Sequence, residues 1–211
     1  METIKVLKEK SVDWNVSIGS QALDLLERKE IKGIEKDNVL SEAINVLGNC
    51  GDPHKQENSK TGLAIGYVQS GKTLSFTTVS ALASQNGFNA IIVIAGSTTK
   101  LVDQTTDRLA GDLDVNKRSD IAWGLFKNPN KSQINEICGS MEVGLFDDKP
   151  VLLITVMKNI THLRNLNLLV DSPKFKSLNL QVLIIDDEAD QASLNTKASS
   201  CLLYTSDAAD E

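Results

Sequence analysis

The sequence predicts an α/β fold in which helices flank a parallel β-sheet. Three apolar runs of buried-strand type, at residues 90–95, 151–156 and 182–185, are separated by segments of helical character. Hydrophobic residues make up 41% of the 211 residues but aromatic residues only 4%, so the expected core is aliphatic, as in buried parallel sheets. Strands that alternate with helices indicate parallel pairing through right-handed crossovers.

Residues 1–60 are expected to form a helical N-terminal extension, with helices at 20–29 and 38–47. A loop rich in Gly, Pro, Asn and Lys over residues 48–60 ends this extension. From residue 61 the predicted order is a strand at 62–65, a helix at 74–84, the strand at 90–95, a helix that ends near 109, a short strand within 120–126, the strand at 151–156, a helix at 160–170, and the strand that begins at 182.

A phosphate-binding loop is predicted between the first of these strands and the helix after it. Residues 66–73 read Gly-Tyr-Val-Gln-Ser-Gly-Lys-Thr and match the pattern G-x-x-x-x-G-K-[ST]. Glycines let the backbone approach phosphates closely, and the N–H groups of such a loop cradle them. Lys72 is expected to reach the terminal phosphates and Thr73 to supply a hydroxyl for Mg²⁺. The predicted nucleotide-binding residues are Gly66, Gln69, Ser70, Gly71, Lys72 and Thr73.

An acidic run, Asp186-Asp187-Glu188-Ala189-Asp190, follows the last predicted strand. Carboxylates placed after a parallel strand lie at the carboxyl edge of the sheet, where ligands of open α/β sheets bind. We expect Asp187 to hold Mg²⁺ through water, with Asp186 as the open alternative. Glu188 is placed to orient or deprotonate the attacking water, so Lys72 and Glu188 are the predicted catalytic residues. The predicted cofactors are therefore ATP and Mg²⁺.

The order of the motifs separates the chain from other phosphate-loop proteins. The segment nearest to the guanine-reading N-K-x-D motif of small GTPases, residues 116–120, is one residue too long and precedes the acidic strand. Asp187-Glu188-Ala189-Asp190 instead resembles motif II of superfamily 2 helicases and translocases, and residues 97–104 resemble their motif Ia. This resemblance implies a RecA-like P-loop ATPase lobe. It also implies DNA contacts at strand ends, for which the candidates are Thr98, Thr99, Gln104 and Lys158.

A narrower resemblance rests on Val68-Gln69-Ser70-Gly71-Lys72-Thr73 and on the doubled Asp before Glu-Ala-Asp. Over roughly residues 40–195 the chain is similar to a bacterial family of candidate endonucleases named for its Z-one domain. Members are helicase-like proteins of restriction–modification and phage-defence systems. The resemblance implies a DNA-dependent translocase with DNA and restriction or defence proteins as partners. The alternative is a nucleotide-binding switch or scaffold in a defence complex.

The family's nuclease chemistry has no clear counterpart in these residues. A restriction-nuclease metal site needs an acid two residues before its lysine, whereas Glu57 precedes Lys60 by three. The arginine-bearing motifs of a second helicase lobe are also missing from the sequence. We therefore expect residues 61–199 to be a truncated ATPase lobe that is inactive alone. Residues 200–211 resemble a translated sequencing-adapter read-through and are expected to be non-native.

Composition indicates a cytoplasmic protein. The three cysteines are scattered and form no C-x-x-C pair, which is typical of reduced thiols. No apolar stretch reaches membrane-spanning length, and the N-terminus lacks the hydrophobic core of a signal peptide. We therefore expect no membrane partner. A formal net charge of −6 argues weakly against a nucleic-acid coat protein but is compatible with a motor that binds DNA along a local stripe.

Overall fold

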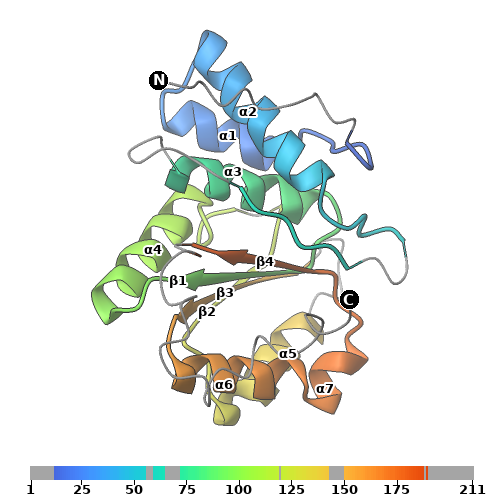
Figure 1. Cartoon of the computed structure of the whole chain (residues 1–211), viewed down its shortest axis with the longest axis vertical. Helices are drawn as coiled ribbons and strands as arrows, with labels where there is room; N and C mark the ends of the chain where they lie inside the picture. Colours follow the sequence, from blue (N-terminus) through green and yellow to red (C-terminus); the bar gives the residue numbers. More distant parts are fainter. Residues whose placement is uncertain are drawn as a thin grey trace, which may run out of the picture. The chain divides into compact units, whose positions relative to one another are not determined.

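The computed structural model describes residues 12–55, 59–64, 72–118, 120–142, 150–187 and 189. The chain divides into two compact units, residues 1–88 and residues 89–211. Their helices and strands are labelled in Figure 1. Among the helices of the described residues, none combines the length and the apolarity needed to cross a bilayer.

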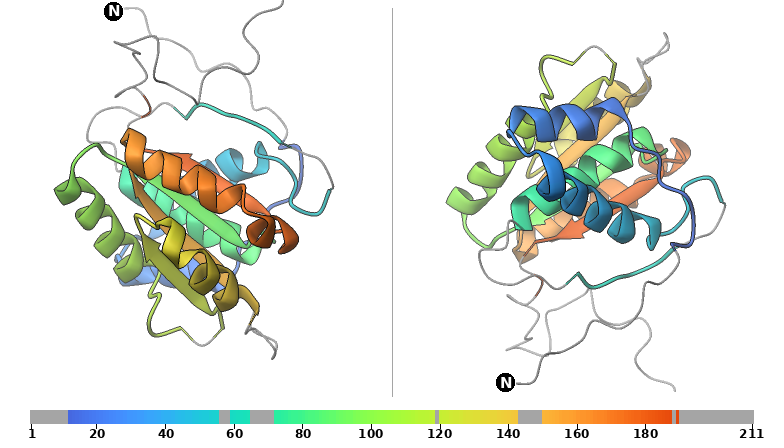
Figure 2. Two further views of the ribbon diagram at one scale, coloured as in Figure 1. Left: turned by 90° about the horizontal axis from the view of Figure 1, so that it is seen from below. Right: turned by 90° about the horizontal axis from the view of Figure 1, so that it is seen from above.

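The first unit is helical. It contains α1 (Ser20–Arg28), α2 (Gly33–Gly48) and α3 (Lys72–Gln85). Two of these helices correspond to those that the N-terminal sequence predicts, although α2 begins five residues before its predicted start at 38. Leu25, Leu26 and Leu47, from the apolar positions of α1 and α2, are fully buried, as expected for amphipathic helices. The three helices are seen from a second direction in Figure 2.

The carboxyl end of α3 is tied to the segment that precedes and opens α1. The side-chain oxygen of Asn86 accepts a hydrogen bond from the N–H of Ser17 at 2.8 Å. The side-chain nitrogen of Asn86 donates to the carbonyls of Ser17 at 2.8 Å and of Leu82 at 2.7 Å. Next to it, Oε1 of Gln85 accepts from the N–H of Gln21 at 2.9 Å. The helix that follows the predicted phosphate loop is therefore anchored at its far end.

A strand is predicted at residues 62–65, but the described residues 62–64 do not form one. Residues 61–64 have no regular secondary structure, and the side chain of Leu63 is 78% exposed. A run of three apolar residues after a glycine offers too little surface to bury by itself, so its apolar character alone was a weak signal. Ile65 lies outside the described residues.

The second unit contains a four-stranded sheet whose strands are all parallel. The strands are β1 (Ala90–Ala95), β2 (Trp123–Lys127), β3 (Val151–Met157) and β4 (Val182–Asp186), in the spatial order β2-β3-β1-β4. The helices are α4 (Thr99–Asp112), α5 (Ile134–Glu142), α6 (Ile160–Val170) and α7 (Pro173–Ser177). The predicted α/β class with a parallel sheet flanked by helices is confirmed.

Helices cover both faces of this sheet. α4 lies on the face that carries Thr155, because Oγ1 of Thr106 on α4 and Oγ1 of Thr155 on β3 are 2.7 Å apart and both residues are buried. The opposite face packs against α5, α6 and α7, which lie together on one side of the sheet in Figure 1. Its buried core consists of Ala90, Ile92, Ile137, Cys138, Leu152, Ile154, Val156, Leu166, Leu169 and Phe175.

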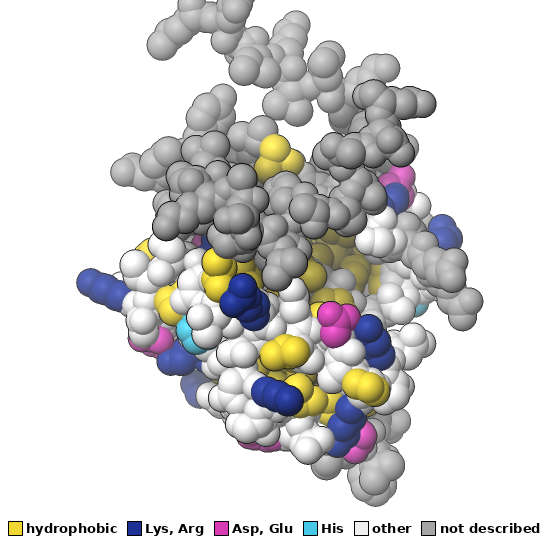
Figure 3. Space-filling view, turned by 60° about the horizontal axis from the view of Figure 1, so that its bottom comes forward, with side chains coloured by type: hydrophobic (Ala, Val, Ile, Leu, Met, Phe, Trp, Pro, Cys, Tyr) yellow, Lys and Arg dark blue, Asp and Glu magenta, His cyan; other side chains and the backbone are white. Residues whose placement is uncertain are grey.

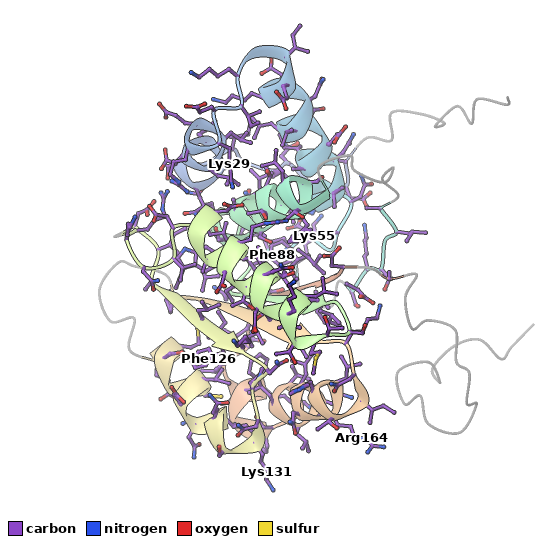
Figure 4. The ribbon with its side chains drawn as sticks, turned by 90° about the vertical axis from the view of Figure 1, so that its left-hand side faces the viewer. Lys29, Lys55, Phe88, Phe126, Lys131 and Arg164 are labelled. Atoms are coloured by element: carbon purple, nitrogen blue, oxygen red, sulfur yellow. The ribbon has the colours of Figure 1, made fainter. Side chains whose placement is uncertain are left out.

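β4 is the last strand in the order of the sheet, and the side chain of Ile184 on it is 57% exposed. A hollow beside it is lined by Val170, Phe175, Lys176, Asn179, Leu180, Val182 and Ile184. Figure 3 shows hydrophobic side chains interspersed with Lys and Arg on the side that α5, α6 and α7 cover. Lys131 and Arg164 point outward from this side in Figure 4.

Candidate functional site

The carboxyl ends of the four parallel strands meet at one edge of the sheet, which is where open α/β sheets bind ligands. The residues immediately beyond β1, β2, β3 and β4 are Gly96, Asn128, Lys158 and Asp187. Three of these connections lead into helices with polar N-caps: Thr98 for α4, Asn130 for the 3₁₀ helix at Lys131–Gln133, and Asn159 for α6. The edge therefore presents the positive ends of the α4 and α6 dipoles.

Lys158 and Asp186 form an ion pair at this edge. Nζ of Lys158 donates to Oδ1 of Asp186 at 2.9 Å. β3 and β4 both neighbour β1 and not each other, so the pair spans the carboxyl end of β1. The side chain of Lys158 is only 11% exposed, whereas that of Asp186 is 38% exposed. The ammonium group is thus held within the edge of the sheet.

The two candidate metal ligands, Asp186 and Asp187, occupy different positions relative to the sheet. Asp186 is in register with Ile94 of β1. Ile184, two residues before Asp186, lines the hollow beside α7. Side chains two residues apart on a strand point to the same face, so Asp186 lies on the face of the sheet that α5, α6 and α7 cover. The N–H of Asp187 donates to the carbonyl of Ile94 at 2.9 Å, which continues the ladder by one residue. Asp187 itself lies in the turn that follows β4.

The donor chemistry of this edge fits Mg²⁺. Carboxylate oxygens are its usual protein ligands, and one or two of them suffice when the phosphates of a nucleotide and water complete the shell. Within the described part of the chain, no group of three or more His, Cys, Asp or Glu side chains is placed to hold a metal ion. A metal held by protein side chains alone is therefore not supported by these residues.

The candidate DNA contacts on α4 are accessible. The hydroxyl of Thr98 accepts from a backbone N–H in the first turn of α4 at 3.3 Å and so serves as its N-cap. Thr99 and Gln104 are exposed. Lys100, Gln104 and Arg108 follow one another at four-residue spacing and are all exposed, so they share one face of the helix. A DNA-contacting role for Thr98, Thr99 and Gln104 stays a prediction.

The charges on α4 are close to balanced. Its bases are Lys100 and Arg108, and its acids are Asp103, Asp107 and Asp112. Nζ of Lys127, at the end of β2, donates to Oδ1 of Asp103 at 2.8 Å, and this hydrogen bond raises the pKa of Lys127. α4 by itself therefore lacks the strongly basic stripe that is typical of nucleic-acid-binding surfaces.

The predicted phosphate loop lies mostly outside the described residues, which leave out Gly66, Gln69, Ser70, Gly71, the side chain of Lys72 and also Glu188. Thr73 is described: it lies in the first turn of α3, and its carbonyl accepts from Oγ1 of Thr77 at 2.7 Å. α3 begins at Lys72, which agrees with a helix that opens at the lysine of the motif. The nucleotide-binding role of the loop stays a prediction.

Comparison of the chain with protein-family models, curated proteins and solved structures finds no match. The resemblance to superfamily 2 helicases and to the Z-one family consequently rests on the motifs themselves. These motifs and the position of the acidic run in the sheet are the basis for the function proposed in the next subsection.

Sequence reasoning missed Asn128, which fixes the edge from the β2 side. Asn128 has a left-handed backbone conformation with φ of 47°, which Asn tolerates better than most residues. Its side-chain oxygen accepts from the N–H of Met157 at 2.7 Å, and its own N–H donates to the carbonyl of Thr155 at 2.8 Å. The dipeptide Asn128-Pro129 is a turn signal that could have drawn attention to this position.

Proposed function

We propose that the chain is the ATP-binding and ATP-hydrolysing lobe of a helicase-like, DNA-dependent translocase of bacterial restriction or phage defence. One observation carries the proposal: the acidic run that begins at Asp186 starts at the carboxyl end of a parallel strand in an open α/β sheet. That is the position where such sheets bind ligands. The complete phosphate-loop sequence at 66–73 and the helix that begins at its lysine support the same proposal.

In this proposal each motif residue has a separate task. Lys72 would contact the β- and γ-phosphates of ATP, and Thr73 and Asp187 would hold Mg²⁺. Glu188 orients or deprotonates the water that attacks the γ-phosphate. Bound Mg²⁺ would neutralise charge on the phosphates. Exposed Thr99, in the first turn of α4, and exposed Gln104, in its second turn, would contact the phosphate backbone of DNA. The N-terminus of the helix also favours an anion beside Thr99.

The test is ATP hydrolysis by the full-length protein with and without double-stranded DNA. DNA should raise the rate, and Lys72→Ala should reduce hydrolysis to background. Lys36→Ala is the matched control, because Lys36 lies on α2, outside every motif. Turnover that does not respond to DNA would refute the translocase part of the proposal, and full turnover in Lys72→Ala would refute the nucleotide site. The 211-residue chain alone should bind ATP more weakly than about 1 μM in a calorimetric titration.

The second candidate function is a nucleotide-binding switch or scaffold in a defence complex. Two observations favour it: the balanced charge of α4 and the pairing of Lys158 with Asp186. Both reduce the positive charge that this edge offers to DNA. Displacement of a triplex-forming strand separates the two functions, because a translocase displaces it while consuming ATP and a switch does not.

A further inference from the structure

We propose that Asn86-Gly87 is a site of spontaneous deamidation that the fold protects, and that its modification releases the carboxyl end of α3. The dipeptide is the only Asn-Gly in the sequence. Glycine after asparagine favours this reaction, because no side chain hinders the approach of the glycine nitrogen to the asparagine side chain. The reaction consumes only water, so it is independent of the proposed nucleotide chemistry.

Gly87 is required by the way in which α3 ends. Its φ is 99°, a conformation that residues with a side chain rarely adopt. The N–H of Phe88 donates to the carbonyl of Ala83 at 3.2 Å across this turn, as in a Schellman motif. A Cβ at Gly87 would also lie 3.0 Å from Cε1 of His54. A larger residue that would slow deamidation is therefore disfavoured at this position.

The folded structure holds the Asn86 side chain away from the reaction. Asn86 is 6% exposed. Its side-chain oxygen accepts from the N–H of Ser17, and its side-chain nitrogen donates to the carbonyls of Ser17 and Leu82. Deamidation expels this nitrogen and then needs water at the same carbon, so the three hydrogen bonds must break first. The folded protein therefore deamidates through local opening at the end of α3.

The chemistry proceeds in two steps. The backbone nitrogen of Gly87 loses its proton and attacks Cγ of Asn86. The new N–Cγ bond forms while the Cγ–Nδ2 bond breaks, and ammonia leaves with the transferred proton, which gives a cyclic succinimide. Water then adds to one of the two ring carbonyl carbons and opens the ring to aspartate or isoaspartate. The loss of ammonia makes the conversion irreversible.

Either product removes the anchor of α3. An ionised carboxylate only accepts hydrogen bonds, so an aspartate at position 86 would face the carbonyl oxygens of Ser17 and Leu82 without a donor. Burying a charge without a partner is strongly unfavourable. Isoaspartate also inserts a methylene into the main chain, which disrupts the turn closed by Phe88 and Ala83. Modified molecules therefore lose the attachment between α3 and the segment before α1.

The first experiment compares deamidation of the folded and the unfolded protein. The protein is incubated at mildly alkaline pH with and without urea, and peptide mass spectrometry follows each asparagine. In urea, Asn86 should react faster than Asn45, which Val46 follows. Without urea, Asn86 should react on the order of a hundredfold more slowly than in urea, because three hydrogen bonds must open. Equal rates with and without urea, or Asn86 no faster than Asn45 in urea, would overturn the proposal.

A pair of variants tests local opening as the route. Gln85→Ala removes the hydrogen bond between Oε1 of Gln85 and the N–H of Gln21, next to Asn86. It should raise the rate at Asn86 in the folded protein about fivefold and leave the rate in urea unchanged. Lys36→Ala, on α2, is the control and should change neither rate. Equal rates at Asn86 in the two folded variants would show that opening at this end of α3 is not the route.

The release of α3 is tested on the modified protein itself. Deamidated molecules carry an additional negative charge and can be separated by anion exchange. They and Asn86→Asp should unfold at a lower urea concentration than the unmodified protein, followed by Trp14 fluorescence in a Trp123→Phe background.

Asn45→Asp is the matched control, because it adds the same charge at an exposed position, and it should leave the midpoint nearly unchanged. A midpoint for the deamidated protein equal to that of Asn45→Asp would overturn the release of α3. The deamidated protein forms from folded material, so it remains informative if Asn86→Asp does not fold.

Discussion

Replacing Asn86 by Leu should destabilise the helical unit by about 3 kcal/mol. The Asn86 side chain is 6% exposed and makes hydrogen bonds to the N–H and the carbonyl of Ser17 and to the carbonyl of Leu82. Each such bond contributes roughly 1 kcal/mol, and leucine can replace none of them. For a urea dependence of about 1–3 kcal/mol per molar, the midpoint of unfolding should fall by about 1–3 M.

Tryptophan fluorescence can report this unit selectively. The chain has two tryptophans, so Trp123→Phe leaves Trp14 as the only one. Trp14 is buried, donates to the carbonyl of Cys50 at 3.2 Å, and has its ring centroid 6.4 Å from that of Phe88. In that background Asn86→Leu is compared with Asn45→Leu, an exposed position on α2 that should change stability by no more than about 0.5 kcal/mol. Equal midpoints for the two variants would refute the anchoring of α3 through Asn86.

Two further predictions concern the second unit and the thiols. Thr155→Val should lower the free energy of unfolding by about 1 kcal/mol, because it removes the hydroxyl contact with Thr106 across the α4–β3 interface. Urea unfolding, followed by the fluorescence of Trp123 in a Trp14→Phe background, measures this change. An unchanged unfolding midpoint would contradict the prediction. Burial raises the pKa of the Cys138 and Cys50 thiols, so both should be less ionised near pH 8 than a free thiol and should react slowly with iodoacetamide. In a Cys201→Ser background, fully buried Cys138 should react more slowly than half-buried Cys50; equal, rapid alkylation measured by mass spectrometry would contradict the burial.

The strands of the sheet could be predicted because burial on both faces leaves a continuous apolar run. The run at 90–95 coincides with β1, and the runs at 151–156 and 182–185 each fall one residue short of β3 and β4. β2 is half-buried along most of its length, so its sequence shows a weaker apolar pattern. The strand predicted within residues 120–126 therefore begins before Trp123, the first residue of β2. α5 was not predicted, although the capping box between Asn130 and Gln133 precedes it.

The residue types of the candidate site could be predicted from the sequence, but the contacts between its side chains could not. The acidic run and the strand-end positions follow from local sequence. The pairing of Lys158 with Asp186, 28 positions apart in the chain, depends on β3 and β4 both lying next to β1. Strand order is a property of the folded sheet, because a local pattern does not state which strands become neighbours. The sequence favours Asp187 as the Mg²⁺ ligand and leaves Asp186 as the alternative.

The exposed edge of β4 has a consequence for handling the protein. Within the described residues β4 pairs only with β1, so its outer row of N–H and carbonyl groups is open to another strand, and Ile184 adds apolar surface beside it. An edge of this kind promotes self-association as concentration rises, because a second copy can add its own strand with little rearrangement. The inner row of amides, bonded to β1, should in turn exchange with solvent far more slowly than the outer row, which makes β4 a strand with one protected and one labile side.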